Sequence, residues 1–385
     1  MNRKILYVVN VDWGFHLHWQ TRIRAYQQAG YQIGLACHFT SKAIRKQFEE
    51  SGVRCFNLRL SRTGLNPFGE LRSLGDVGRV IEAFQPDLVH TNTVKANIYG
   101  GLAATRRSIP LVSTVAGRGW AYTDTSLRAR LVSRVVDALY RRIFRRDNAR
   151  MIFENPDDRD FFVARKLLSA EQANVVLGAG VDLSKFALAG AERMRPNSVL
   201  FASRMLKSKG LDTLVAACEV LRGRGKTVEL RVAGILDETQ TDALSKDQID
   251  TWANSGRIDW LGQRSDMQDL IAEAMVVVLP TRYGEGVPRI LIEAAACGRP
   301  LVASDVVGCR EIVRDGNNGS RVAPLADAQT WADSIGAILD DVDHAVALGQ
   351  AGRRLVEAEF ADEIVCRKTL EIYAGALTSG GQGDA

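Results

Sequence analysis

The sequence predicts an α/β protein made of two Rossmann-like, doubly wound parallel-sheet domains. The chain has 385 residues, 46% of them hydrophobic, which is longer than one domain with a single core usually is and fits two domains. Short β-branched runs alternate with longer helical patterns, and the strands are almost continuously apolar, as in parallel sheets covered on both faces. This alternation fades near residues 182–198 and then starts again, which indicates two domains of the same kind.

Thirteen strands are predicted in order along the chain. The first half holds KILYVV (4–9), QIGLAC (32–37), CFNLRL (55–60), DLVHT (87–91), PLVSTV (110–115), RMIFE (150–154) and ANVVL (173–177). The second half holds SVLFAS (198–203), VELRVAG (228–234), IDWLG (258–262), MVVVLP (275–280), PLVAS (300–304) and GSRVAP (319–324), with helices expected at 212–224 and 265–274.

The predicted domain limits are 1–185 and 186–360. A helix over 361–377 is expected to cross back to the first domain, and the Gly-rich end, 378–385, is expected to be a disordered tail. Ligands of open α/β sheets bind at the carboxyl ends of the strands. With two such domains, the default binding site is a central cleft that both domains face.

Charge is distributed unequally. Residues 1–190 contain 28 Lys and Arg against 16 Asp and Glu, a net of +12, whereas residues 191–385 contain 22 against 29, a net of −7. The first half is therefore expected to bind an anionic partner.

We expect a cytoplasmic protein. The six cysteines show no metal-ligand spacing, the apolar run at the N-terminus is short, and no apolar stretch reaches about 20 residues.

The segment 128–150 is the most basic part of the chain. It carries eight arginines (128, 130, 134, 141, 142, 145, 146 and 150) and two acids. An apolar stripe is expected along Leu131, Val135, Leu139 and Phe144. One interpretation is a surface helix docked on its own domain, with a solvated arginine face. The other is a basic amphipathic surface that attracts an anionic membrane, and both can hold together. Nucleic acid is not expected, because no aromatic platform accompanies the arginines.

Two cations follow the predicted strand 198–203. Arg204 and Lys209 stand in the loop between this strand and the next helix, which is where an α/β sheet receives a phosphate group best. Arginine binds phosphate oxygens bidentately, and lysine adds a point charge. Two solvated loop cations would be the alternative.

The stretch GEGVPRILIE holds two carboxylates, Glu285 and Glu293, eight positions apart. Pro288 suits the first helical turn, and glycines allow a ligand close to the amides of Gly286 and Val287. At about 1.5 Å per helical residue the two acids lie at most roughly 12 Å apart, the scale of a nucleotide sugar from ribose to hexose. A solvated acid followed by an ordinary helix acid is the alternative.

These motifs resemble a known family. The run TRYGEGVPRILIEAAACGRPLVASDVVGCREIV (281–313) resembles the E-x7-E signature of retaining glycosyltransferases of family 4, which have the two-Rossmann GT-B fold, and SRMLKSKGLDTLV resembles their R-x4-K-G element. GAGVDLSKF (178–186), the N-terminal VDWGFHLHWQTRIRAYQQAGYQIGLAC, HTNTVKANIYGGLAA (90–104) and VSTVAGRGWAY (112–122) resemble segments of members that act in bacterial polysaccharide assembly, and the resemblance covers about 360 residues.

The resemblance implies roles for donor-site residues. Arg204 and Lys209 would hold the donor diphosphate, Glu285 would contact the sugar, and Glu293 would accept from the ribose hydroxyls. Of these, Arg204, Lys209 and Glu285 would be the catalytic residues. Further donor contacts would come from Gly14, in the first strand-to-helix turn, and from Leu261, Gly262, Gly286, Val287 and Pro288.

The resemblance also implies a partner on the acceptor side. His18, His90 and Lys95 are candidates to contact the acceptor. Many family members carry a histidine where this chain has Val115–Ala116–Gly117, so that role has no counterpart here. Neither a metal nor another cofactor is expected. Asp158 and Asp160 superficially form a D-x-D motif, but they precede a helical run, where aspartate is a usual cap.

The function expected from the resemblance is retaining transfer of a hexose or N-acetylhexosamine from an NDP-sugar to a lipid-linked saccharide at the cytoplasmic face of the membrane, with a UDP-sugar as the expected donor. A nucleotide-sugar 2-epimerase and a non-catalytic nucleotide-sugar binder remain alternatives. The second would predict loss of one of the four donor-site charges, and all four are present. A dinucleotide dehydrogenase is disfavoured, since no G-x-G-x-x-G follows a strand.

Overall fold

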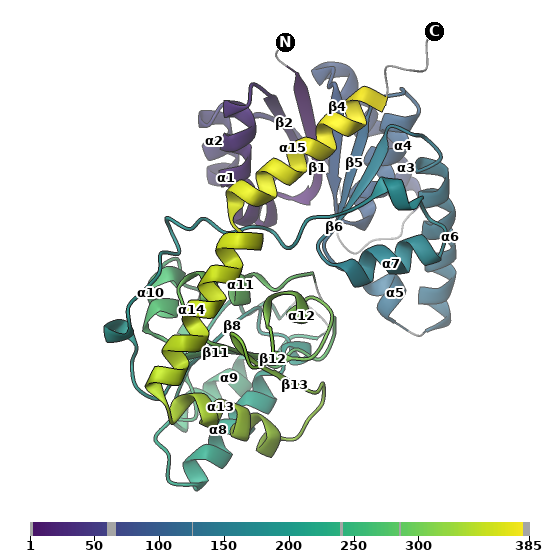
Figure 1. Cartoon of the computed structure of the whole chain (residues 1–385). Coiled ribbons are helices and arrows are strands. Elements are labelled where there is room, and N and C mark those ends of the chain that lie inside the picture. Colours follow the sequence, from purple (N-terminus) through teal and green to yellow (C-terminus); the bar gives the residue numbers. More distant parts are fainter. Residues whose placement is uncertain (1–2, 60–66, 125, 239–241, 285, 380–385) are drawn as a thin grey trace. The chain divides into compact units, whose positions relative to one another are not determined.

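The computed structural model describes residues 3–59, 67–124, 126–238, 242–284 and 286–379. The chain forms two compact units, unit 1 from residues 1–179 and 362–385 and unit 2 from residues 180–361 (Figure 1). Among the described residues, no helix combines the length and the hydrophobicity needed to cross a bilayer.

Unit 1 is built on a seven-stranded parallel sheet in the order β3-β2-β1-β4-β5-β6-β7. Its strands are β1 (Lys4–Val11), β2 (Gln32–His38), β3 (Arg54–Asn57), β4 (Leu88–Asn92), β5 (Leu111–Val115), β6 (Ala149–Phe153) and β7 (Ala173–Val175). Its helices are α1 (Asp12–Gln28), α2 (Lys42–Glu50), α3 (Pro67–Phe84), α4 (Val94–Thr105), α5 (Trp120–Thr123), α6 (Leu127–Ile143), α7 (Pro156–Ala164), the short η1 (Ala170–Gln172) and α15 (Asp362–Ser379).

Unit 2 repeats the plan with a six-stranded parallel sheet in the order β10-β9-β8-β11-β12-β13. Its strands are β8 (Ser198–Ala202), β9 (Glu229–Ala233), β10 (Asp259–Gly262), β11 (Val276–Leu279), β12 (Leu301–Ser304) and β13 (Gly319–Val322). Its helices are α8 (Leu211–Gly223), α9 (Lys246–Asn254), α10 (Met267–Glu273), α11 (Arg289–Ala296), α12 (Cys309–Ile312), α13 (Ala328–Leu339) and α14 (Val342–Glu359), with the short η2 (Ala191–Arg193) and η3 (Lys207–Lys209).

The predicted α/β fold is confirmed, and each of the thirteen predicted strands corresponds to a strand of the two sheets. Two segments differ from expectation. The basic segment 128–150 is not one helix, because α6 ends at Ile143 and the chain turns before β6 begins at Ala149. Residues 378 and 379, expected in the tail, are the last residues of α15, and 380–385 lie outside the described residues.

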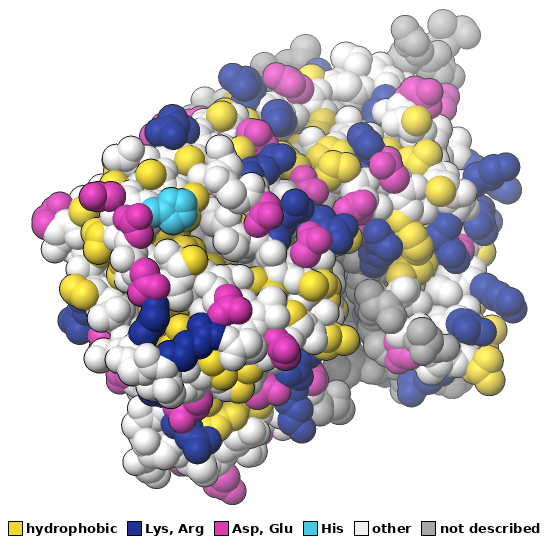
Figure 2. Space-filling model, turned by 60° about the horizontal axis from the view of Figure 1, so that its bottom comes forward, with side chains coloured by type: hydrophobic (Ala, Val, Ile, Leu, Met, Phe, Trp, Pro, Cys, Tyr) yellow, Lys and Arg dark blue, Asp and Glu magenta, His cyan; other side chains and the backbone are white. Residues whose placement is uncertain are grey.

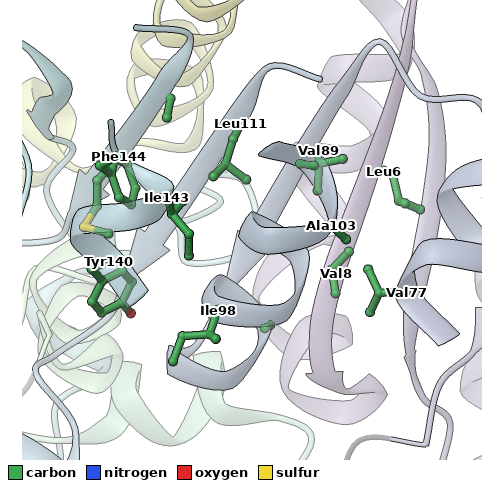
Figure 3. Close-up of a cluster of buried hydrophobic side chains, with 14 of the residues drawn as sticks. Leu6, Val8, Val77, Val89, Ile98, Ala103, Leu111, Tyr140, Ile143 and Phe144 are labelled. Carbon is green, nitrogen blue, oxygen red and sulfur yellow. The ribbon is translucent and has the colours of Figure 1, made fainter. Parts of the chain in front are cut away.

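The core of unit 1 lies on both faces of its sheet, because side chains of a strand alternate between faces. On one face, Leu6 and Val8 of β1 pack with Val77 of α3, Ile98 of α4 and Tyr140 of α6 (Figure 3). On the other, Ile5, Tyr7 and Val9 pack with helices α1 and α15. The C-terminal helix α15 therefore contributes to the core of unit 1 although 182 residues of unit 2 separate it from the rest of that unit in sequence.

A buried polar chain joins α15 to the sheet. The hydroxyl of Tyr373 lies 2.6 Å from the hydroxyl of Tyr7 and 2.5 Å from Nδ1 of His90, and Nε2 of His90 lies 2.8 Å from Oγ1 of Thr114. His90 is fully buried, and burial lowers its pKa to about 3, with the nearby charge of Arg22 acting in the same direction. The imidazole is therefore neutral in the folded protein and serves as a hydrogen-bonding element of the core.

We expect His90 to make unit 1 sensitive to acid. The pKa of this group falls from an ordinary value of 6.5 to about 3 on folding. Below pH 6.5 the unfolded chain therefore binds a proton that the folded chain does not, and stability is lost by up to about 1.4 kcal/mol per pH unit as the pH falls. Thermal denaturation of His90→Gln between pH 7 and pH 4 should show a shallower decline than the parent protein. The exposed His344→Gln serves as control, and parallel curves for His90→Gln and the parent would contradict the assignment.

Candidate functional site at the carboxyl edge of the unit 2 sheet

The carboxyl ends of β8 and β11 define the candidate site. These strands are neighbours, but the chain winds away from them in opposite directions along the sheet, through β9 and β10 on one side and β12 and β13 on the other. Such a topological switch point leaves a crevice in which open α/β sheets bind their ligands. The loop that follows β8 carries Arg204 and Lys209, and the loop that follows β11 carries Glu285 to Pro288. The sheet topology thus brings the two predicted motifs to one edge.

Lys209 and Arg204 differ in their environments. Arg204 is exposed, whereas Lys209 retains 6% of its surface and its Nζ lies 5.1 Å from the ring centre of Tyr283, in cation–π geometry. A buried ammonium loses hydration, and its position is fixed by the side chains around it. Lys209 is therefore a largely desolvated positive charge at the switch point, and Arg204 is a solvent-exposed one on the loop before it.

A close approach between the two loops holds Lys209 in place. Gly210 follows Lys209 with φ of +79°, and a Cβ added there would come within 2.0 Å of the carbonyl oxygen of Pro280. Only glycine fits, because a side chain would be strained by the left-handed backbone conformation and would also clash with the chain at the end of β11. The R-x4-K-G element therefore needs its glycine to bring the loop of Lys209 against the end of β11.

Arg282 connects the same two loops. Its backbone N–H donates to the carbonyl of Ser208 at 2.8 Å, and its guanidinium donates to the carbonyl of Lys207 at 3.2 Å and to the carboxylate of Asp212 at 2.6 Å. From the other side, the carboxylate of Asp242 accepts from the backbone N–H of Ser208 at 3.1 Å and from its hydroxyl. Sequence reasoning missed both residues. The position of Arg282 inside the Glu285 motif was a signal, whereas nothing in the sequence connects Asp242 to this loop.

The second carboxylate, Glu293, lies on α11 with 8% of its surface exposed. Burial raises its pKa, while the nearby charges of Arg289, whose Nε lies 2.5 Å from its Oε1, and of Lys185 oppose that shift. Arg289 thus holds the carboxylate in one orientation. Glu285, the other carboxylate, lies outside the described residues.

The entrance of α11 is buried. Gly286, Val287 and Pro288 are all buried, and Pro288 is the N-cap of the helix rather than part of its first turn, so α11 begins one residue later than predicted. Pro288 is still suited to this place, because its fixed φ, here −63°, matches the chain entering a helix. Because α11 is the helix that follows β11, its N-terminus lies at the carboxyl edge of the sheet, where an anion is favoured.

Leu261 and Gly262 lie at the end of β10, on the same edge. The carbonyl of Gly262 accepts from the N–H of Gly234 at 2.9 Å, and a Cβ on Gly234 would come within 1.7 Å of the carbonyl oxygen of Ser203. The ends of β10, β9 and β8 are therefore in close contact, and Leu261 and Gly262 border the same edge as Arg204.

The remaining predicted site residues belong to unit 1. Gly14 is the third residue of α1, not part of a turn, because the helix begins at Asp12 directly after β1; a Cβ there would have no neighbour within 4 Å. Lys95 is half-buried in the first turn of α4, beside Thr93, whose φ of +86° is strained for a residue with a Cβ. His18 lies on α1, and its side chain is not described.

His90 does not agree with the expected acceptor contact. It has no exposed surface, and both of its ring nitrogens are bonded within unit 1. Asp158 also has a structural role, because it is buried and pairs with Arg118 at 2.6 Å and with its N-cap residue Asn155. Asp160 pairs with Arg159 at the surface.

Replacing Gly210 tests the close approach of the two loops. We expect Gly210→Ala to lower the free energy of unfolding of unit 2 by about 3 kcal/mol or more, since it adds a backbone clash to the cost of a left-handed conformation. Gly225→Ala is the matched control: its φ is +82°, but an added Cβ would meet no atom within 4 Å, so only about 1–2 kcal/mol should be lost. Equal losses in chemical denaturation would show that the contact with Pro280 is unimportant.

Comparison with known proteins agrees with this geometry. One family model, described as glycosyl transferase 4-like, matches residues 4–153, and a second, described as glycosyl transferases group 1, matches residues 196–341. The chain is 27% identical over 343 residues to an N,N'-diacetylbacillosaminyl-diphospho-undecaprenol alpha-1,3-N-acetylgalactosaminyltransferase of Campylobacter jejuni, with 85% of this chain and 87% of that protein covered. It is 24% identical over 325 residues to a capsular polysaccharide biosynthesis glycosyltransferase of Staphylococcus aureus, covering 80% and 81% of the two chains.

Solved structures show the same fold. The HepE protein of Anabaena, solved in complex with UDP and glucose, matches with a TM-score of 0.77 at 20% identity, and 97% of this chain and 100% of that chain are covered. A glycosyltransferase from Rickettsia africae matches with a TM-score of 0.77 at 17% identity, covering 98% and 99% of the two chains. Together with the family models, these matches show that the chain belongs to glycosyltransferase family 4, the group 1 glycosyltransferases, which retain anomeric configuration and have the GT-B fold.

Proposed function

We propose that the protein transfers a hexose or an N-acetylhexosamine from a UDP-sugar to a lipid-linked saccharide during assembly of a cell-surface polysaccharide. The observation that carries this proposal is the buried Lys209 fixed at the switch point of unit 2, on the same edge as the loop that leads to Glu293. The Campylobacter jejuni relative is named for transfer onto a diphospho-undecaprenol-linked sugar, and the Anabaena structure holds UDP and glucose. Such chemistry would take place at the cytoplasmic face of a membrane.

In this proposal unit 2 binds the donor. Lys209 and Arg204 hold the diphosphate, with the entrance of α11 adding backbone amides. Glu293, oriented by Arg289, accepts from the ribose hydroxyls, while Glu285 orients the sugar through its hydroxyls. The backbone at Leu261 and Gly262 borders the place for the base, and Gly14 and Lys95 of unit 1 are the candidates for phosphate and acceptor contacts.

The transfer step breaks the bond between the anomeric carbon and the diphosphate oxygen, with the electron pair leaving on the diphosphate. The acceptor hydroxyl forms the new glycosidic bond and gives its proton to the departing oxygen. Lys209 is a fixed cation at the site where negative charge increases, so it stabilises the transition state more than the ground state. This electrostatic role is the one that the burial of Lys209 supports.

Removing the proposed catalytic groups should abolish transfer without unfolding the protein. We expect Lys209→Ala and Glu285→Gln to keep the parent melting temperature to within a few degrees and to lose at least about a hundredfold in kcat. The control is Lys207→Ala, an exposed lysine two residues away whose side chain has no part in the proposal. Transfer of radiolabelled sugar to an undecaprenyl-diphosphate-linked saccharide gives the rate, and a thermal-shift screen of NDP-sugars selects the donor beforehand. Near-parental turnover of both variants would refute the site.

Arg282 should act as a positioning residue for Lys209. Its loss leaves the carbonyl of Lys207 and the carboxylate of Asp212 without their guanidinium partner, while the backbone bond to Ser208 is kept, so we expect Arg282→Ala to raise KM for the donor and lower kcat by about ten- to a hundredfold. Arg224→Ala, which removes a pair with Asp333 in the same unit, is the control for general loss of an ion pair. A purely structural role would lower the melting temperature and leave KM and kcat of the folded fraction unchanged.

A further inference from the structure

Helix α6 exposes three of its apolar side chains to solvent. Leu127, Leu131 and Val135 are 81%, 65% and 54% exposed, respectively. The expected stripe of Leu131, Val135, Leu139 and Phe144 is thus divided: Leu131 and Val135 are exposed, whereas Phe144 is buried and Leu139 packs against the core. Because residues four apart are neighbours on a helix surface, the three exposed side chains form one ridge, named here the α6 ridge.

The opposite face of α6 explains why the ridge points outward. Ala129, Ser133, Val136, Tyr140 and Ile143 are the buried residues that dock the helix, and Tyr140 and Ile143 join the core cluster of unit 1 (Figure 3). The helix packs on its unit through the small residues Ala129 and Ser133 near its start and through the large residues Tyr140 and Ile143 near its end. The ridge therefore takes no part in the packing of the helix on its own unit.

Arginines border the ridge. Arg128, Arg130 and Arg134 are exposed on the same turns, and the one acid within α6, Asp137, is buried and pairs with Arg165 at 2.6 Å. At the last turn of α6 and beyond it, Arg141, Arg145, Arg150 and Lys166 line a surface hollow together with the two acids Asp147 and Glu171. Figure 2 shows basic side chains with hydrophobic ones between them over this part of unit 1, at the right of the view. The surface thus combines exposed apolar groups with positive charge and carries no exposed acid on the helix.

We propose that α6 lies in the interface of an anionic bilayer, with the α6 ridge inserted between lipid chains and the bordering arginines at the lipid phosphates. The inference deepens the proposed function, since a lipid-linked acceptor brings the enzyme to a membrane. It differs from a purely electrostatic contact in that leucine and valine side chains enter the bilayer. Charge complementarity selects lipid over a second copy of this chain, because two such faces would bring their arginines together.

The test is flotation of the purified full-length protein with vesicles of phosphatidylcholine, either alone or mixed with phosphatidylglycerol, without donor or acceptor. We expect binding to the mixed vesicles only, and part of it should persist at salt concentrations that screen surface charge. The triple variant Leu127→Ser, Leu131→Ser, Val135→Ser should lose the salt-resistant part and bind at least about tenfold more weakly. Leu325→Ser in unit 2, at a position 80% exposed, is the matched control and should bind as the parent does.

Three results would overturn the proposal: unchanged binding of the triple variant, binding that disappears entirely in salt for the parent protein, or equal loss in the Leu325→Ser control. If the parent protein is a dimer in gel filtration and the triple variant a monomer with unchanged vesicle binding, the ridge is an interface between copies instead. Folding of the variant is checked by its circular dichroism and melting temperature. Since no sugar transfer is measured, failure here leaves the assignment of Lys209 and Glu285 untouched, and failure of that assignment leaves vesicle binding unaffected.

Discussion

The close contact between the loops after β8 and β11 is the constraint on which the donor site depends. Gly210 allows the backbone after Lys209 to reach the carbonyl of Pro280, and Arg282 then bonds the backbone of Lys207 and Ser208. Parallel strands end together at one edge, but nothing in a sheet alone fixes the loops that follow them. Here backbone contacts hold the segment around Lys209 against Pro280 and Arg282, the residues that directly follow β11.

Charges in this assembly are held at some cost to stability. Lys209 and Glu293 are both nearly buried, and the raised pKa of Glu293 shows that burial disfavours its ionised form despite the Arg289 partner. A desolvated, oriented charge interacts more strongly with a ligand than a solvated one does, because no hydration shell has to be displaced when the ligand binds. Burying these preorganised charged groups therefore lowers the free energy of unfolding of unit 2, as is common for binding sites.

Unit 1 uses its polar groups in a different way. His90, which the sequence offered as a ligand contact, is a neutral element of the core that connects Tyr373 of α15 to Thr114 of β5. The same helix α15 lies far along the chain from the strands that it covers, so the Tyr373 contacts tie the last helix to the first domain. On the opposite face of the sheet, α6 directs Tyr140 and Ile143 inward and Leu127, Leu131 and Val135 outward, which leaves a surface suited to a lipid interface.

The sequence by itself determined the strands, their division into two parallel sheets and the residue types of the donor site. It could do so because strand signals and the two loop motifs are local: apolar runs of five residues, a glycine after a lysine, a proline before a helix. Tertiary structure decided which face of α6 is buried, since its arginines and leucines allow more than one rotation, and only the packing of Tyr140 and Ile143 selects one. It also decided that His90 is buried and that Arg282 and Asp242 contact the loop of Lys209. These contacts join residues far apart in the sequence or use backbone carbonyls, which every residue has, so no sequence pattern indicates them.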